Sequence, residues 1–261
     1  MLNSARQVPL RSALWLGFFA AILASWIWLY DMARRMGLDL VGAVRPDAMM
    51  PMDMMQDMAR FWPLFLMWTV MMAAMMLPTL VPTLTTYDTL IHSADGSRPG
   101  WLGVLAGYSA VWLTFAAGIT ILQLLFAQWG LIDRMGIARS GYIAAALLFV
   151  VGLYQFTWIK EMCHGVCHAP MHYFLGHWRT GFAGGTRMGL GLGAYCAGCC
   201  WGFMALGFVG GVMSLLWMGL ATVIMVLEKL PQVGAYITKP VGVALIVAAI
   251  GLTAKTSGIL G

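Results

Sequence analysis

Long apolar runs of helical length are the feature that most limits how this chain folds. They recur along the sequence, for example at 12–30, 61–83 and 101–128. A helix of about 20 apolar residues crosses the hydrocarbon of a bilayer, whereas a barrel strand alternates in polarity over about 10 residues. Only 10% of the residues are charged, against about 25% in a water-soluble domain. We therefore predict an all-α, polytopic transmembrane helical bundle that forms one domain over residues 1–261.

The apolar runs predict about seven spans, near 12–30, 61–83, 101–128, 141–159, two within 189–227, and 239–254. The block 189–227 is too long for one span, so we expect it to fold back at Gly207, Gly210 and Gly211. Pro78 and Pro82 predict a kinked or unwound end of the second span, which would free backbone carbonyls there.

Two connections carry unusual residues. The segment DAMMPMDMMQDMAR, residues 47–60, predicts a short Met-rich amphipathic helix that lies on the membrane surface. Residues 160–186 are expected to form a loop rich in histidine and cysteine. The basic residues are scattered between spans without a Lys or Arg run. We therefore do not expect this protein to bind nucleic acid. Eight of the 15 Lys and Arg residues fall inside if the N-terminus is inside, so we predict that orientation.

All five cysteines lie in one third of the chain, and their odd number argues against a disulfide framework. Cys163 and Cys167 are four residues apart, which places them on one face if this segment is helical, and His164 and His168 form a second such pair. Thiolate with imidazole suits zinc or copper, and thiolate favours Cu(I). The alternative is a polar loop with free thiols and solvated histidines, His172 among them.

The fifth predicted span carries the other three cysteines. At about 100° per residue, Cys196 and Cys200 lie within about 40° of each other. Met204, Gly189 and Gly193 share their face, while Gly198 and Gly202 form a GxxxG pair on the other side. Glycines on both sides predict close helix neighbours and a buried cysteine face. The alternative is that cysteine is a small packing residue here.

Thioethers are the second set of soft donors, since 22 residues are methionine. They favour Cu(I) over hard cations, although methionine also fills cores or faces lipid without binding a ligand. The candidates in the spans are Met71, Met75 and Met204, and those in the surface segment are Met49, Met52, Met54, Met55 and Met58. Glu228 is a further candidate ligand or proton carrier; alternatively it pairs with Lys229 at the membrane interface.

No P-loop, nucleophile elbow or haem-attachment motif is present, so we expect a binding protein more than an enzyme. The motifs WTVMMAAMMLP, YQFTWIKEMCHGVCHAP, AYCAGCCWGFM and FVGGVM resemble those of a bacterial family of predicted metal-binding integral membrane proteins, a domain-of-unknown-function family. The resemblance implies a bacterial inner-membrane protein and a metal site drawn from Met71, Met72, Met75, Met76, Pro78, Lys160, Cys163, Cys167, Cys196, Cys199, Cys200, Trp201, Met204 and Glu228. The chain departs from the family pattern at His164 and His168.

Our leading hypothesis is a membrane protein that handles copper, as Cu(I), by transport, storage or delivery to a cuproenzyme, with zinc as the alternative metal. Its expected partners are the lipid bilayer and another membrane protein or a metallochaperone. One alternative is a membrane thiol oxidoreductase that uses Cys163 with Cys167, or Cys199 with Cys200. Another is a structural subunit of a larger membrane complex that docks through its glycine faces.

Overall fold

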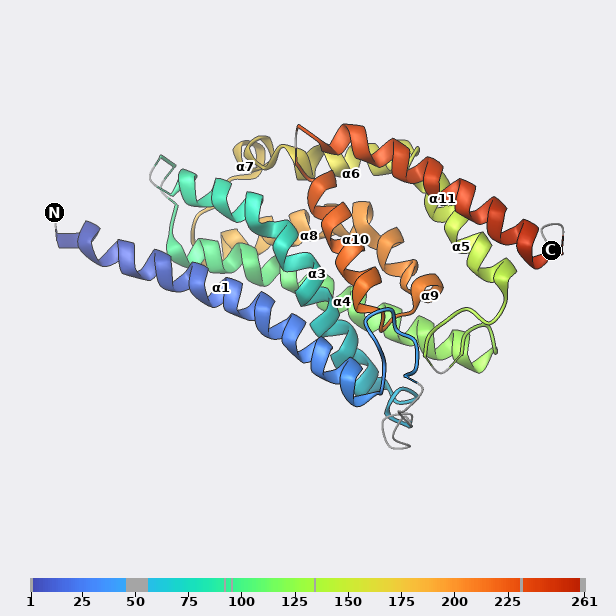
Figure 1. Cartoon of the computed structure of the whole chain (residues 1–261). Helices are drawn as coiled ribbons and strands as arrows, with labels where there is room; N and C mark the ends of the chain where they lie inside the picture. The colour runs from blue at the N-terminus through green and yellow to red at the C-terminus, as the bar shows by residue number, and fades with distance from the viewer. Residues whose placement is uncertain are drawn as a thin grey trace.

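The chain folds into a bundle of α-helices (Figure 1). The computed structural model describes residues 2–45, 56–91, 93–94, 96–133, 135–230 and 232–258. Its helices are α1 (Leu2–Arg35), α3 (Phe61–Leu90), α4 (Arg98–Gln128), α5 (Gly141–Tyr154), α6 (Trp158–His168), α7 (Pro170–His177), α8 (Gly181–Ala205), α9 (Gly207–Gly210), α10 (Leu215–Glu228) and α11 (Gly234–Thr256). The prediction of an all-α fold is confirmed. The predicted surface helix near 47–60 falls mostly outside the described residues.

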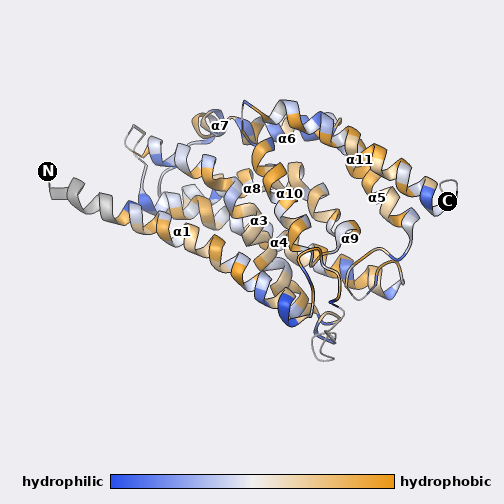
Figure 2. Cartoon of the chain, in the orientation of Figure 1, coloured by the Kyte–Doolittle hydropathy of each residue, from blue (hydrophilic) through white to orange (hydrophobic). Residues whose placement is uncertain are grey.

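Among the described residues, five helices are long and apolar enough to cross a membrane, and α5 with α6 adds a sixth candidate if this bent pair counts as one span. The sixth predicted span in chain order, the second of the two within 189–227, corresponds to α10, which has 14 residues, fewer than the roughly 20 of a full crossing. Hydrophilic residues gather at helix ends and loops (Figure 2). This pattern is compatible with a multi-pass membrane protein.

The outer helices display large apolar side chains at helical spacing. Val243, Val247 and Ile250 of α11 are each more than half exposed, and α1 presents Leu23 and Ile27 in the same way. In water, leaving such a side chain exposed costs about 1.5–3 kcal/mol relative to burying it. A hydrocarbon environment would remove that cost, so these exposed apolar faces are compatible with contact with lipid.

The sequence predicted a kinked or unwound end of the second span at Pro78 and Pro82, and the structure contradicts the unwinding. Helix α3 continues through both prolines to Leu90. Pro78 lacks the N–H that would bond the carbonyl of Ala74, and that carbonyl instead accepts a hydrogen bond from the indole N–H of Trp26 on α1, at 3.1 Å. A neighbouring helix thus satisfies the freed group, as membrane helices with internal prolines require.

The predicted loop over 160–186 is also wrong, because most of it is helical. Helix α6 begins after Thr157, whose hydroxyl accepts from the backbone N–H of Lys160, and Ala169 separates it from α7. The axis bends by 63° between α5 and α6, so α6 turns back over α8. The predicted fold-back of 189–227 is confirmed: Gly211 adopts a φ of +93° between α9 and α10, a conformation that favours glycine.

Glycines allow α4 and α8 to pack with their backbones in contact. A β-carbon at Gly107 of α4 would collide with the carbonyl oxygen of Thr186 on α8, and one at Gly189 of α8 would collide with that of Val104. On the other side of α8, a β-carbon at Gly202 would lie 2.8 Å from Val151 of α5. The expectation of close neighbours on both glycine faces is confirmed, and it explains why the cysteine face of α8 is buried.

We expect Gly107→Ala to destabilise the bundle, because its nearest neighbours are backbone atoms of α8 that no rotamer change can move. Overpacking of this kind costs about 1–3 kcal/mol. Thermal unfolding of the detergent-purified protein, followed by circular dichroism, measures the loss. Gly118→Ala on the same helix is the matched control, since nothing lies within 4 Å of its β-carbon position. Equal melting temperatures for the two variants would contradict close α4–α8 packing.

Candidate metal centre

Three cysteines of α8 converge inside the bundle. Their spacing places Cys196, Cys199 and Cys200 within about one turn, and their sulfur atoms all lie within 4.8 Å of one another. The Cys199 and Cys200 sulfurs are 3.3 Å apart. Each of the three residues is at most 3% exposed. Sulfur–metal bonds of about 2.3 Å hold ligand sulfurs within about 4.6 Å of each other, so this geometry is close to that of a three-thiolate metal site.

Helix α6 adds a fourth sulfur to this group. The Cys167 and Cys199 sulfurs are 3.8 Å apart, although the two residues come from different helices. Cys163 lies one turn earlier, and its sulfur would be 2.7 Å from a β-carbon at Gly198. The missing side chain at Gly198 therefore lets α6 approach α8. The two cysteine groups, separate in the sequence, lie together in the fold, and all five thiols are free and buried.

A buried ion pair fixes the relative positions of α6, α8 and α10. The Lys160 ammonium lies 2.8 Å from the Glu228 carboxylate and donates to the carbonyl of Cys199, also at 2.8 Å. Lys160 and Glu228 are both 1% exposed, and the Lys160 Nζ lies 5.3 Å from the centre of the Phe203 ring. Because buried charges require partners, Lys160 joins the helix that carries Cys163 and Cys167 to α10 through the ion pair and to α8 through the Cys199 carbonyl.

A second lysine reaches the sulfur group directly. The Lys229 ammonium lies 3.0 Å from the Cys196 sulfur and donates to the Thr79 hydroxyl at 2.8 Å. The Tyr108 hydroxyl is also 3.0 Å from the Cys196 sulfur and lies 3.1 Å from the Thr79 hydroxyl. A nearby cation stabilises the thiolate, which is the form of cysteine that binds metal. The network therefore favours the thiolate form of Cys196.

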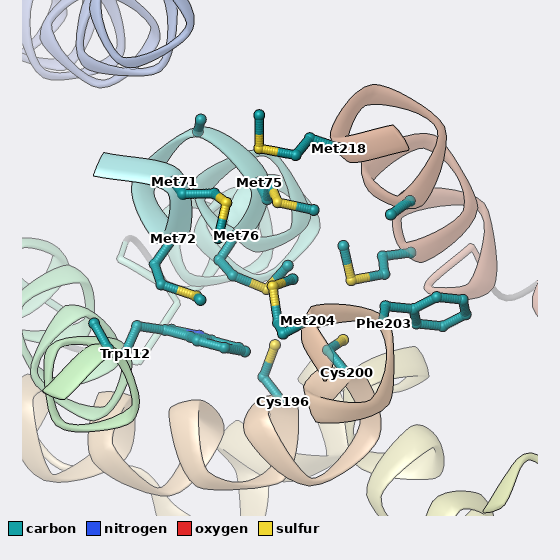
Figure 3. Close-up of a cluster of buried hydrophobic side chains, with 14 of the residues drawn as sticks. Met71, Met72, Met75, Met76, Trp112, Cys196, Cys200, Phe203, Met204 and Met218 are labelled. Atoms are coloured by element: carbon teal, nitrogen blue, oxygen red, sulfur yellow. The ribbon is translucent and has the colours of Figure 1, made fainter. Parts of the chain in front are cut away.

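Methionines of α3 border the same space. In Figure 3, Met76 of α3 lies beside Met204 and Cys196 of α8, Met72 lies beside Trp112, and Met71 and Met75 lie on the side of Met218 of α10. Eight residues of α3, α8 and α10 form this sulfur-rich layer, and each is at most 3% exposed: Met71, Met72, Met75, Met76, Cys196, Cys200, Met204 and Met218. An adjoining cavity of about 130 Å³, lined in part by Met72, Met76 and Trp112, leaves space in which thioethers can reorient.

The predicted histidine candidates differ in their positions. His164 and His168 lie on α6 next to the cysteines, with ring centroids 4.0 Å apart. His172 is exposed on α7, and His177 of that helix stacks on Tyr173. The fold therefore brings two of the four histidines of this stretch to the thiol region.

Among the predicted surface methionines, Met58 falls within the described residues, and it does not join the cluster. Met49, Met52, Met54 and Met55 lie outside the described residues. Met58 precedes α3 and is half-buried, and the helix from Phe61 to Met76 spans roughly 22 Å at 1.5 Å per residue. Met58 therefore lies about a helix length from the cysteines. Glu228, the other predicted ligand, pairs with Lys160 and not with Lys229 at an interface.

Sequence reasoning missed three residues that contact the sulfur group or support it, namely Thr79, Tyr108 and Lys229. Lys229 carries the clearest signal: it lies between Glu228 and Leu230 after an apolar run, and an ionisable residue in such a setting is a functional candidate by default. Tyr108 and Thr79 carry no comparable signal, because their role depends on which helices become neighbours.

Comparison with known proteins gives one match. Residues 65–252, well over half of the chain, match the model of a protein family described as PpoB2, copper chaperone. No curated protein and no solved structure matches the chain. The matched region contains all five cysteines and the ion pair between Lys160 and Glu228, whereas residues 49–58 lie outside it.

Proposed function

The chain belongs to the copper chaperone family PpoB2, and we propose that it is a membrane-embedded protein that binds Cu(I) and delivers it to a cuproenzyme. The observation that carries this proposal is the convergence of three thiols within 4.8 Å, with the Cys167 sulfur 3.8 Å from that of Cys199. Thiolates and thioethers are soft donors that select Cu(I) among biological metals, while zinc is the alternative for a thiolate set.

In this proposal Cys196, Cys199 and Cys200 hold the copper. Cys167 exchanges with them as a fourth donor, and Cys163 extends the set along α6. The burial of all these sulfurs protects Cu(I) from water, and the thioethers of Met71, Met75 and Met204 line the inner side of the site. Three thiolates carry negative charge, which the ammonium of Lys229 and the copper ion partly compensate.

Burial also separates this function from thiol–disulfide exchange. Reactive thiols in oxidoreductases are partly exposed so that a substrate disulfide can reach them. All five thiols of this chain are buried, the most exposed at 9%. This favours metal binding over the oxidoreductase alternative.

We further propose that the protein resides in a bacterial inner membrane with its N-terminus inside. The segment with Met49, Met52, Met54 and Met55 would then lie outside, where it could collect copper. Delivery requires a recipient, either a cuproenzyme or a metallochaperone that docks at the α6 side, because α6 provides the cysteines farthest from the bundle interior.

The proposal is tested by elemental analysis of the protein purified from membranes of copper-supplemented cells. The wild-type chain is expected to retain about one or more copper ions, as a thiolate cluster does. A variant with all five cysteines changed to serine provides the background. If the wild-type protein held neither copper nor zinc above this background, the proposed function would be overturned. If it held zinc without copper, zinc would be the metal that the site binds, and the copper assignment would be wrong.

A further inference from the structure

Two histidines of α6 lie beside the thiol cluster without belonging to it. His164 and His168 each follow a cysteine by one residue, so the imidazole pair lies about 100° around the helix from the thiol pair. Their ring centroids are 4.0 Å apart. One short helix therefore carries two adjacent rows of metal-binding side chains.

The nitrogens of this pair are available to a ligand. His164 is 7% exposed, and its Nε2 has no hydrogen-bond partner among the described residues, whereas buried polar atoms nearly always have one. The Nε2 of His168 contacts the backbone carbonyl oxygen of Glu228. A ring nitrogen that donates to a carbonyl leaves the opposite nitrogen, Nδ1, with a free lone pair. The pair therefore offers lone pairs on adjacent rings.

We propose that His164 and His168 form a second copper site, an outer station through which copper passes between the buried thiols and the recipient. This inference rests on the proposed function. Metal–imidazole bonds are about 2 Å long, and rings whose centroids lie 4.0 Å apart are close enough for one nitrogen of each to reach the same ion. Two imidazoles are weaker ligands for Cu(I) than three thiolates, so copper resides on the thiols and occupies the histidines in transit.

The position of the pair suits such a station. His168 is partly exposed, while the exposed fraction falls to 9% at Cys167 and 3% at Cys199. The two histidines lie toward the C-terminal end of α6, where the unsatisfied carbonyls favour a cation. His168 thus lies nearest the protein surface, His164 lies as deep as the α6 thiols, and the α8 thiols lie deepest in the bundle.

Glu228 connects the two stations. Its backbone carbonyl contacts His168, and its carboxylate holds Lys160, which donates to the carbonyl of Cys199. A displacement of α6 that moves the histidines must therefore also strain the contact between Lys160 and α8. This connection keeps the imidazole pair and the thiols at a fixed separation.

The experiment measures copper release from the full chain in detergent. Wild-type protein and the variant His164→Gln/His168→Gln are loaded with one equivalent of Cu(I) and mixed with excess bathocuproine disulfonate in a stopped-flow instrument. Copper content is expected to be equal, because the thiols hold the ion. Copper release from the variant is expected to be about tenfold slower. Loss of a residue that supports a metal site changes metal affinity or activity by about tenfold or more.

His172→Gln is the matched control, since His172 is an exposed histidine two residues into α7, and it should release copper at the wild-type rate. If the double variant kept both its copper content and its copper release rate, the proposal of an outer station would be overturned. It would also be overturned if the double variant lost its bound copper. The single variant His168→Gln, at the partly exposed position, gives the same test if the double variant does not fold. Failure of the wild-type protein to bind any copper would instead overturn the proposed function.

Discussion

Replacing Cys196, Cys199 and Cys200 together with serine should abolish tight copper binding. A serine hydroxyl is a hard, neutral donor, and it offers Cu(I) neither the charge nor the polarisability of a thiolate. We expect the affinity for Cu(I) to fall by more than about 100-fold. Losing a residue that only supports a metal ligand lowers the affinity by about 10- to 100-fold, and this variant loses the ligands themselves. The measurement is competition for Cu(I) against a chelator of known affinity, with the full chain in detergent.

Two further variants make this test specific. Ala194→Ser adds a hydroxyl to an exposed position of the same helix and should bind copper as the wild-type protein does. Cys163→Ser/Cys167→Ser removes only the thiols of α6, and it should bind more weakly than wild type but more tightly than the triple variant. If the α6 double variant lost as much affinity as the triple variant, the principal ligands would not be those of α8.

Breaking the buried ion pair should destabilise the protein strongly. Lys160→Met leaves the Glu228 carboxylate buried without a cation, and one carboxylate oxygen already lacks a partner among the described residues. Removing one member of a buried pair costs about 3–5 kcal/mol, whereas replacing both members with apolar residues is often neutral. We therefore expect Lys160→Met alone to unfold at a much lower temperature than Lys160→Met/Glu228→Leu.

A double-mutant cycle separates this effect from simple loss of packing. Thermal unfolding of Lys160→Met, Glu228→Leu and the double variant gives the coupling between the two residues. Additive losses, within about 0.5 kcal/mol, would show that the two charges do not depend on each other. Because both residues lie beside the cysteines of α6 and α8, the copper content of the double variant shows whether the pair serves only to hold the helices together.

The helical fold and the chemistry of the site could be predicted from the sequence, because both depend on local patterns. Apolar runs of helical length predict long apolar helices wherever they occur in a chain. Three cysteines within five residues of one helix must converge, since a helix returns to the same face every three or four residues. The glycines on either side of Cys196 likewise predicted the burial of that face.

The helical state of α6 and the continuity of α3 could not be predicted in the same way. A segment with charges, histidines and cysteines has the composition of a loop, and only its packing against α8 makes the helix favourable. Pro78 lacks a backbone N–H and frees the carbonyl of Ala74 whether the helix breaks or continues, so the local sequence does not distinguish the two outcomes. Trp26, 52 residues earlier, decides between them by donating to the freed carbonyl of Ala74.

The sequence by itself therefore determined that this is a helical bundle whose soft ligands are concentrated in one region, because residue type and helical period are local properties. Only the tertiary structure decided that Cys167 meets Cys199, that Glu228 pairs with Lys160, and that Lys229 and Tyr108 reach Cys196. Each of these contacts joins residues from different segments of the chain. Which helices become neighbours depends on the close α4–α8 packing and on the 63° bend before α6, and neither is a property of any single segment.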